Sequence, residues 1–107
     1  MGKPIDIVGG GSSQPNWTWD GVSVDIASHT QANPYVVPND GYLLIVAPAG
    51  KVAEANTEDT AIPMEAVAAG LTSGAVYTTF FLKKGMKVYP STKPTGSSFV
   101  FRGLTTY

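Results

Sequence analysis

Glycine and proline divide this chain into short segments, and this division constrains the fold more than any other feature of the sequence. The chain has 107 residues, with 12 glycines and 8 prolines. Helices usually need about 10–12 uninterrupted residues, whereas strands need only about 4–8. The length corresponds to one domain. We therefore expect a single all-β domain.

Alternation of apolar and polar residues marks where the strands should lie. About seven or eight short strands, with turns at roughly ten-residue spacing, predict a β-sandwich or a barrel. Segment 62–69, "IPMEAVAA", is compatible with either a short helix or a strand. We expect residues 1–16 to form an N-terminal arm and loop, and residues 17–107 to form the β domain. The expected strands are 17–26, 35–37, 42–46, 51–54, 75–82, 86–89 and 98–104.

Two turns can be predicted from residue chemistry. In the segment 38–41, "PNDG", proline presets its φ angle, asparagine and aspartate bond nearby backbone, and glycine accepts positive φ. In "KKG", residues 83–85, two lysines precede a glycine, which predicts a charged and solvated turn. Both turns should connect neighbouring strands.

The segment 75–82, "AVYTTFFL", is apolar on both faces of its expected strand. Alternation places Phe80 on one face, and Tyr77 and Phe81 on the other. A sheet with one wet side does not favour aromatic residues on both faces. One face can pack in the core of the domain. The other needs a second cover, which is either another element or another copy of the chain.

Trp17 and Trp19 raise a question of binding. They lie two residues apart on an expected strand, so they share one face. If exposed, they would form a stacking platform for a sugar ring or an anchor for a protein partner. Because tryptophan is usually well buried, and the pattern places Val22, Val24 and Ile26 on the same face, we expect both indoles to be buried.

Composition excludes several classes of function. Charged residues make up 14% of the chain, against roughly 25% in an average soluble domain, so much of the surface is neutral or forms an interface. Seven basic and eight acidic residues give no concentration of positive charge for nucleic acid. No apolar run approaches the ~20 residues of a membrane helix. We expect neither a nucleic-acid partner nor a membrane partner.

The sequence offers little for catalysis. His29 lies in a polar turn near Asp25, but a lone histidine beside one carboxylate is common on surfaces. Glu58 and Asp59 are adjacent in a polar loop without the spacing of a calcium loop. The chain has no cysteine and no Gly-x-Ser-x-Gly pattern. We therefore predict no catalytic residue, no metal ligand, no cofactor and no enzymatic activity.

Two segments resemble a known family. The strand-turn-strand around "PNDGYLLI" and the later "TTFFLKKGMKVY" resemble trimeric jelly-roll domains of the tumour-necrosis-factor-like type, which bacteriophages use as fibre heads, receptor-binding tips and capsid decorations. The resemblance implies a jelly-roll-like antiparallel β-sandwich that forms a homotrimer, with Tyr77, Thr79, Phe80 and Phe81 at the trimer interface. The matching residues are Tyr35, Pro38, Asp40, Gly41, Tyr42, Ile45, Thr79, Phe80, Lys84, Gly85 and Val88.

The sequence and this resemblance together give a functional hypothesis. We expect a virion structural protein, made in the host cytoplasm, that decorates a capsid or forms a head fibre or fibre tip. Its expected partners are copies of itself and another virion protein, such as a major capsid or fibre protein. Ile5, Ile7 and Val8 would form the docking arm. The alternative is a carbohydrate-binding module that uses Trp17 and Trp19 on a host surface glycan.

Overall fold

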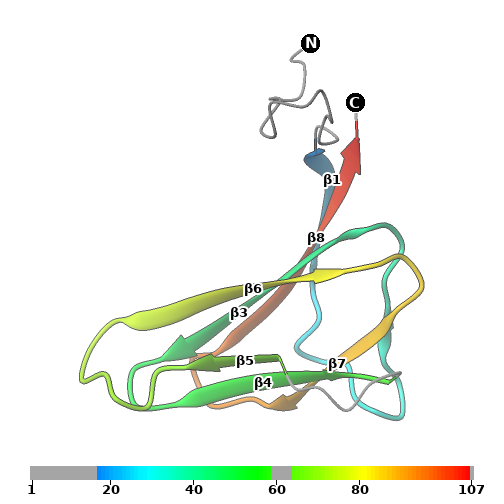
Figure 1. Cartoon of the computed structure of the whole chain (residues 1–107). Helices are drawn as coiled ribbons and strands as arrows, with labels where there is room; N and C mark the ends of the chain where they lie inside the picture. The colour runs from blue at the N-terminus through cyan, green and yellow to red at the C-terminus, as the bar shows by residue number, and fades with distance from the viewer. Residues whose placement is uncertain (1–16, 59–63, 107) are drawn as a thin grey trace, which may run out of the picture.

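All regular structure in the described part of the chain is β-strand. The computed structural model describes residues 17–58 and 64–106 (Figure 1). Each expected strand is present, with bounds that differ from the prediction by a few residues. The strands are β1 Trp17–Asp25, β2 Tyr35–Val36, β3 Gly41–Pro48, β4 Val52–Thr57, β5 Met64–Val67, β6 Ala75–Leu82, β7 Lys87–Thr92 and β8 Ser98–Thr106.

The strands form two antiparallel sheets that face each other in a sandwich-like arrangement. One sheet has the order β1-β8-β3-β6, and the other has the order β2-β7-β4-β5. The first strand pairs with the last, the second with the seventh, the third with the sixth and the fourth with the fifth. Successive pairs alternate between the two sheets, so most sheet contacts join residues that are far apart in the sequence.

The core lies between the sheets because alternate residues of facing strands point inward. Sheet β1-β8-β3-β6 contributes large side chains, such as Ile45 and Phe101, whereas strand β4 contributes Ala53 and Ala55. Small residues opposite large ones allow the sheets to interdigitate at close-packed density. The largest fully buried side chains are Phe99, Phe101, Ile26, Leu43, Ile45, Leu82, Val37 and Val88.

Segment 62–69 contributes a strand, which decides between the two alternatives left by the sequence. In β5, Met64 and Ala66 are buried, whereas Glu65 and Val67 are exposed. This period of two suits a sheet with one face on the core, and β5 pairs with β4 along its length. Tertiary packing against the other sheet therefore overrides the helix preference of alanine and glutamate.

The β1–β8 pair extends beyond the rest of the sandwich (Figure 1). Its register runs from Trp17 opposite Thr106 to Asp25 opposite Val100, with an irregularity between Trp19 and Ser23. At the extended end, no strand of the second sheet lies opposite the pair (Figure 1). The first residues of β1 therefore lie outside the core.

Gly41 occupies a position with no space for a side chain. It is the first residue of β3 and pairs with Leu82 on one side and Gly103 on the other. A Cβ atom at this position would lie 2.6 Å from Cζ of Phe101 and would clash with the backbone oxygen of Arg102. The glycine of the predicted "PNDG" turn is thus required by close packing.

We predict that Gly41→Ala destabilises the fold by about 1–3 kcal/mol, because the added methyl group overpacks a fully buried position. Urea or thermal unfolding of the variant would measure the change. Gly70→Ala is the matched control: a Cβ atom at Gly70 would have no neighbouring atom within 4 Å, and Gly70 has no positive φ. Equal losses of stability in the two variants would contradict the packing argument.

Candidate functional site

The side of sheet β1-β8-β3-β6 that faces away from the core forms an outer face. The strand registers place Tyr77 beside Val46, and Phe81 beside Tyr42. Tyr77 is 69% exposed and Phe81 is 53% exposed, although both are large aromatic residues. The outer face consists of Trp17, Trp19, Ser23, Asp25, Tyr42, Leu44, Val46, Pro48, Ala75, Tyr77, Thr79, Phe81, Ser98, Val100, Arg102 and Leu104.

Charges on the outer face lie towards its β1 edge. Arg102 and Asp25 are its charged residues, and both are exposed. Within the described residues neither forms an ion pair, and the Asp25 carboxylate accepts a hydrogen bond from Ala27 N at 2.9 Å. The β3 and β6 half of this face is therefore neutral and largely apolar.

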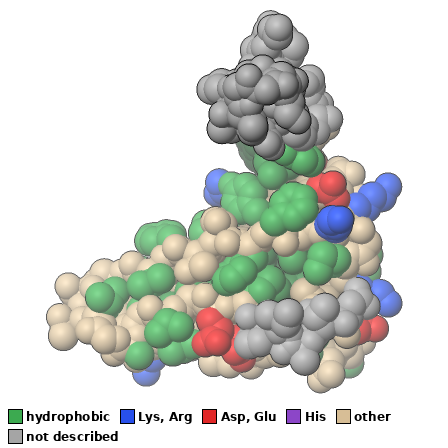
Figure 2. Space-filling model, in the orientation of Figure 1, with side chains coloured by type: hydrophobic (Ala, Val, Ile, Leu, Met, Phe, Trp, Pro, Cys, Tyr) green, Lys and Arg blue, Asp and Glu red, His purple; other side chains and the backbone are tan. Residues whose placement is uncertain are grey.

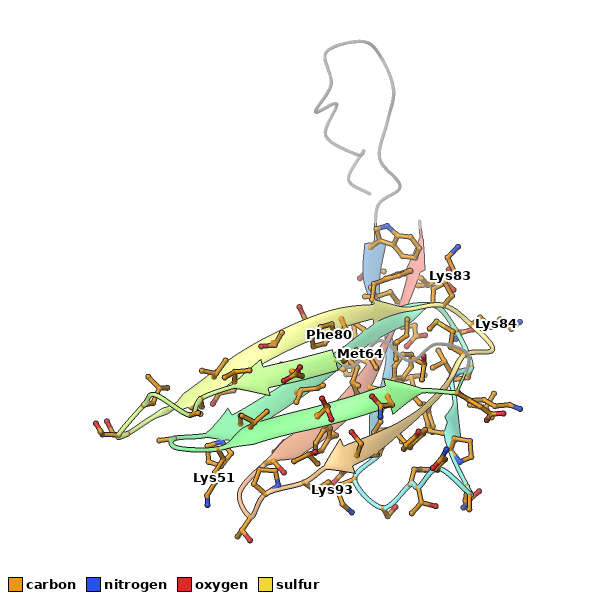
Figure 3. The ribbon with its side chains drawn as sticks, turned by 60° about the horizontal axis from the view of Figure 1, so that its bottom comes forward. Lys51, Met64, Phe80, Lys83, Lys84 and Lys93 are labelled. Atoms are coloured by element: carbon orange, nitrogen blue, oxygen red, sulfur yellow. The ribbon has the colours of Figure 1, made fainter. Side chains whose placement is uncertain are left out.

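The predicted interface residues divide between the two faces of β6. Tyr77, Thr79 and Phe81 are exposed on the outer face. Phe80 lies on the opposite face, partly buried against the core, and Figure 3 shows it beside Met64. Because the side chains of a strand alternate, Phe80 cannot share a surface with Tyr77 and Phe81.

Trp17 and Trp19 are exposed, so the expectation that they are buried was wrong. Trp17 is 43% exposed and Trp19 is 58% exposed. They pair with Thr106 and Leu104 on the outer face, whereas Val24 pairs with buried Phe101 on the core face. Between Trp19 and Ser23, β1 advances by four residues while β8 advances by two, so β1 contains two extra residues. Because two is an even number, the tryptophans stay on the same face as Ser23 and Asp25.

Hydrogen bonding and ring contacts fix the orientations of both indoles. Trp19 donates from Nε1 to the backbone oxygen of Val22 at 2.9 Å. The ring of Trp17 meets the ring of Phe81 in an edge arrangement, with centroids 6.2 Å apart and planes at 68°. Figure 2 shows apolar side chains gathered where β1 and β8 leave the body of the sandwich, with acidic and basic side chains beside them.

A hollow of about 260 Å³ opens next to Trp17. It lies where the turn before β3 and the turn after β6 meet the extended end of β8. Asp40 accepts two hydrogen bonds: its carboxylate accepts one from Lys84 N at 2.8 Å, and its backbone oxygen accepts one from Leu104 N at 2.7 Å. These bonds hold the three segments together. The hollow is lined by Trp17, Asn39, Asp40, Lys84, Leu104 and Thr105.

Next to these lining residues, the Asp20 carboxylate occupies the space left by a glycine. A side chain on Gly103 would clash with this carboxylate. Asp20 accepts hydrogen bonds from Val22 N at 2.7 Å and from Asn39 Nδ2 at 3.0 Å. Burial raises the pKa of Tyr35, and the negative charge of Asp20 raises it further. No local pattern in the sequence indicates this cluster, because its members come from β1, β2, β8 and the turn before β3.

The residues considered for catalysis do not assemble into a site. His29 Nδ1 lies 3.1 Å from the backbone oxygen of Asn33, and its ring meets that of Tyr35 edge to face. Glu58 forms an ion pair with Lys87 at 3.7 Å, both side chains being half exposed, and Asp59 lies outside the described residues. In the described ranges, no three potential metal-ligating side chains are grouped.

The remaining predicted site is the docking arm. Ile5, Ile7 and Val8 lie outside the described residues, so their role stays a prediction. Within residues 17–58 and 64–106, no helix is long and apolar enough to cross a membrane.

Comparisons with other proteins add no relative. No protein-family model, curated protein or solved structure matches this chain. The fold and the surfaces described above are therefore the basis for the functional proposals.

We predict that Tyr35 makes the fold less stable in alkali. Because its pKa is raised in the folded state, the folded protein holds the phenol proton more tightly than the unfolded chain does. The Tyr35 phenol therefore adds to the free energy of unfolding. This contribution is complete below the unfolded pKa of about 10 and decreases as the pH rises through the folded pKa. Urea unfolding from pH 8 to pH 11 should show a steeper decrease for the wild type than for Tyr35→Phe. Tyr89→Phe, on β7 and away from the outer face, serves as the control and should keep the wild-type slope.

Proposed function

We propose that this protein is a non-enzymatic structural subunit of a bacteriophage particle, in which a jelly-roll domain assembles as a homotrimer through its outer face. The observation that carries the proposal is the exposed aromatic surface formed by Tyr77 and Phe81 on β6. Exposed apolar patches of this kind mark interaction surfaces in soluble proteins. The occupant we assign to it is a second copy of the chain.

Strand pairing supports a jelly roll. Such a fold has eight antiparallel strands in two sheets and contains two Greek keys. The pairs β1·β8, β2·β7, β3·β6 and β4·β5, alternating between the sheets, are those expected when one long hairpin is wound into two layers. This pattern agrees with the family that the "PNDGYLLI" and "TTFFLKKGMKVY" segments resemble.

The chemistry of the outer face suits contact with identical chains. Its β3 and β6 half is apolar. Asp25 on β1 and Arg102 on β8 carry opposite charges near the β1 edge, and Arg102 lies two residues along β8 from Val100, the residue that pairs with Asp25. Around a threefold axis, the acid of one chain could approach the base of the next while the aromatic residues meet near the axis. Obligate interfaces commonly bury about 2,000 Å² or more and are more apolar than transient ones.

The virion location and the other partners follow from the resemblance. Capsid decorations and fibre modules need self-association and a docking partner, and need no catalytic set. We assign docking on a major capsid or fibre protein to the arm that contains Ile5, Ile7 and Val8. No nucleic-acid or membrane contact is part of this function, and the site of action is the assembled particle.

A second function, recognition of a host surface glycan, is favoured by the exposure of Trp17 and Trp19. Exposed indoles are amphipathic surfaces that stack well on the apolar face of a sugar ring. An array of immobilised glycans tests this function, and a fibre tip would combine it with trimer formation.

We predict that the wild-type chain has three times the mass of one chain by light scattering at micromolar concentration. Tyr77→Glu combined with Phe81→Glu should give folded monomers, because the interface would have to bury two carboxylates, which we expect to weaken association by about a thousandfold or more. Both side chains are exposed in the single chain, so the fold itself should tolerate the change.

The control for this experiment is Val67→Glu. Val67 is a similarly exposed apolar residue on β5, in the other sheet. It should leave the mass unchanged. A wild-type protein that stays monomeric at micromolar concentration, or loss of the trimer only in the Val67 variant, would rule out the proposed interface.

A further inference from the structure

The hollow beside Trp17 combines an aromatic surface with polar groups of several kinds. The indole of Trp17 contacts Phe81 edge to face, and 43% of the Trp17 surface is exposed. The other polar residues that line the hollow are Asn39, Asp40, Lys84 and Thr105, whose side chains carry an amide, a carboxylate, an ammonium group and a hydroxyl. An aromatic residue and residues that can donate and accept hydrogen bonds thus line one open hollow, a combination that is common in small-molecule sites.

Several of these polar groups have hydrogen-bonding capacity left for a ligand. Asp40 uses one carboxylate oxygen for Lys84 N, and Asn39 uses its amide nitrogen for Asp20. Among the described residues, the Lys84 ammonium group and the Thr105 hydroxyl bond to no other protein group. Figure 3 shows Lys83 and Lys84 at the end of the molecule where β1 and β8 extend.

The framework of the hollow is rigid although the hollow opens to solvent. Asp40 is bonded to both β8 and the turn after β6, and Asn39 is bonded to Asp20, which lies against Gly103. A ligand would therefore meet Asp40 and Asn39 already positioned, whereas the exposed Lys84 side chain would be ordered on binding.

We propose that this hollow binds one terminal, neutral pyranose unit of a glycan, with the sugar ring stacked on Trp17. This proposal rests on the glycan-recognition function, and the site borders the proposed trimer surface because Trp17 contacts Phe81. At about 260 Å³ the hollow is smaller than the ~300–1,000 Å³ of sites for drug-sized ligands, so it suits a single ring. Asp40 and Lys84 have opposite charges, so the local field favours neither an acidic nor a basic ligand. A carboxylate and an ammonium group also suit vicinal hydroxyls, which both donate and accept hydrogen bonds.

Trp17 and Trp19 have different roles in this site. Trp19 does not line the hollow, and its Nε1 is already bonded to Val22. The platform is therefore Trp17 alone, with Lys84 and Asp40 from loops far away in the sequence. Tyr77, the most exposed aromatic residue of the outer face, is also outside the hollow.

The experiment uses the full chain on an array that carries neutral and sialylated terminal sugars. The best-bound sugar is then titrated as its free methyl glycoside by calorimetry. We expect Trp17→Ala to weaken binding about tenfold or more, and Lys84→Ala to weaken it about two- to tenfold. Trp19→Ala tests whether the second indole takes part, and Val36→Ala, at an exposed apolar position on β2 in the other sheet, is the control and should bind like the wild type. Lys84 is exposed, so its variant keeps the fold even if the Trp17 variant does not.

The outcomes separate this site from the general function. Failure of the wild type to bind any glycan overturns both the site and glycan recognition. If glycan binding survives Trp17→Ala and Lys84→Ala but is lost in Trp19→Ala, the hollow is not the binding site, although glycan recognition stands. A preference for sialylated over neutral sugars overturns the proposed ligand class. Tyr77→Glu alone tests trimer formation separately, since Tyr77 does not line the hollow, whereas Phe81 contacts Trp17.

Discussion

A two-layer sandwich can cover only one face of each of its sheets. In this protein the constraint has its largest effect on the sheet β1-β8-β3-β6. The core face of this sheet carries residues such as Ile45 and Phe101, and its outer face carries Tyr77 and Phe81. Both faces are rich in large apolar side chains, but the second sheet lies against only one of them. The outer face therefore stays uncovered in the single chain, and the assembly that we propose would cover it.

The end of the sandwich is organised by a different set of contacts. Asp40 bonds to β8 and to the turn after β6, so one turn residue joins three segments that are distant in the sequence. Asp20 fills the space over Gly103 and holds Asn39 in place. Together these contacts hold Asp40 and Asn39 in place beside Trp17. The glycan site that we propose is a consequence of the same bonds that close this end of the fold.

Several features of the fold could be predicted because they depend on neighbouring residues only. Alternation in the segment 98–104 places Phe99 and Phe101 on one face and Val100 and Arg102 on the other, and in the structure the first pair is buried. The faces of 75–82 were also predictable, since period two is a local property of a strand. The helix-or-strand choice for 62–69 was not, because alanine and glutamate favour a helix and only pairing with β4 makes this segment a strand.

The sequence by itself determined that the chain is built of short strands joined by turns, because glycine, proline and side-chain alternation act over a few residues. It also predicted cover on both faces of the strand with Tyr77 and Phe81, and in the single chain only the face with Phe80 is covered. Only the tertiary structure decided which strands pair, that Trp17 and Trp19 are exposed, and that Asn39, Lys84 and Thr105 line one hollow with Trp17. The physical reason is that these features depend on sheet register and on where the second sheet ends, and both arise from contacts between residues far apart in the chain.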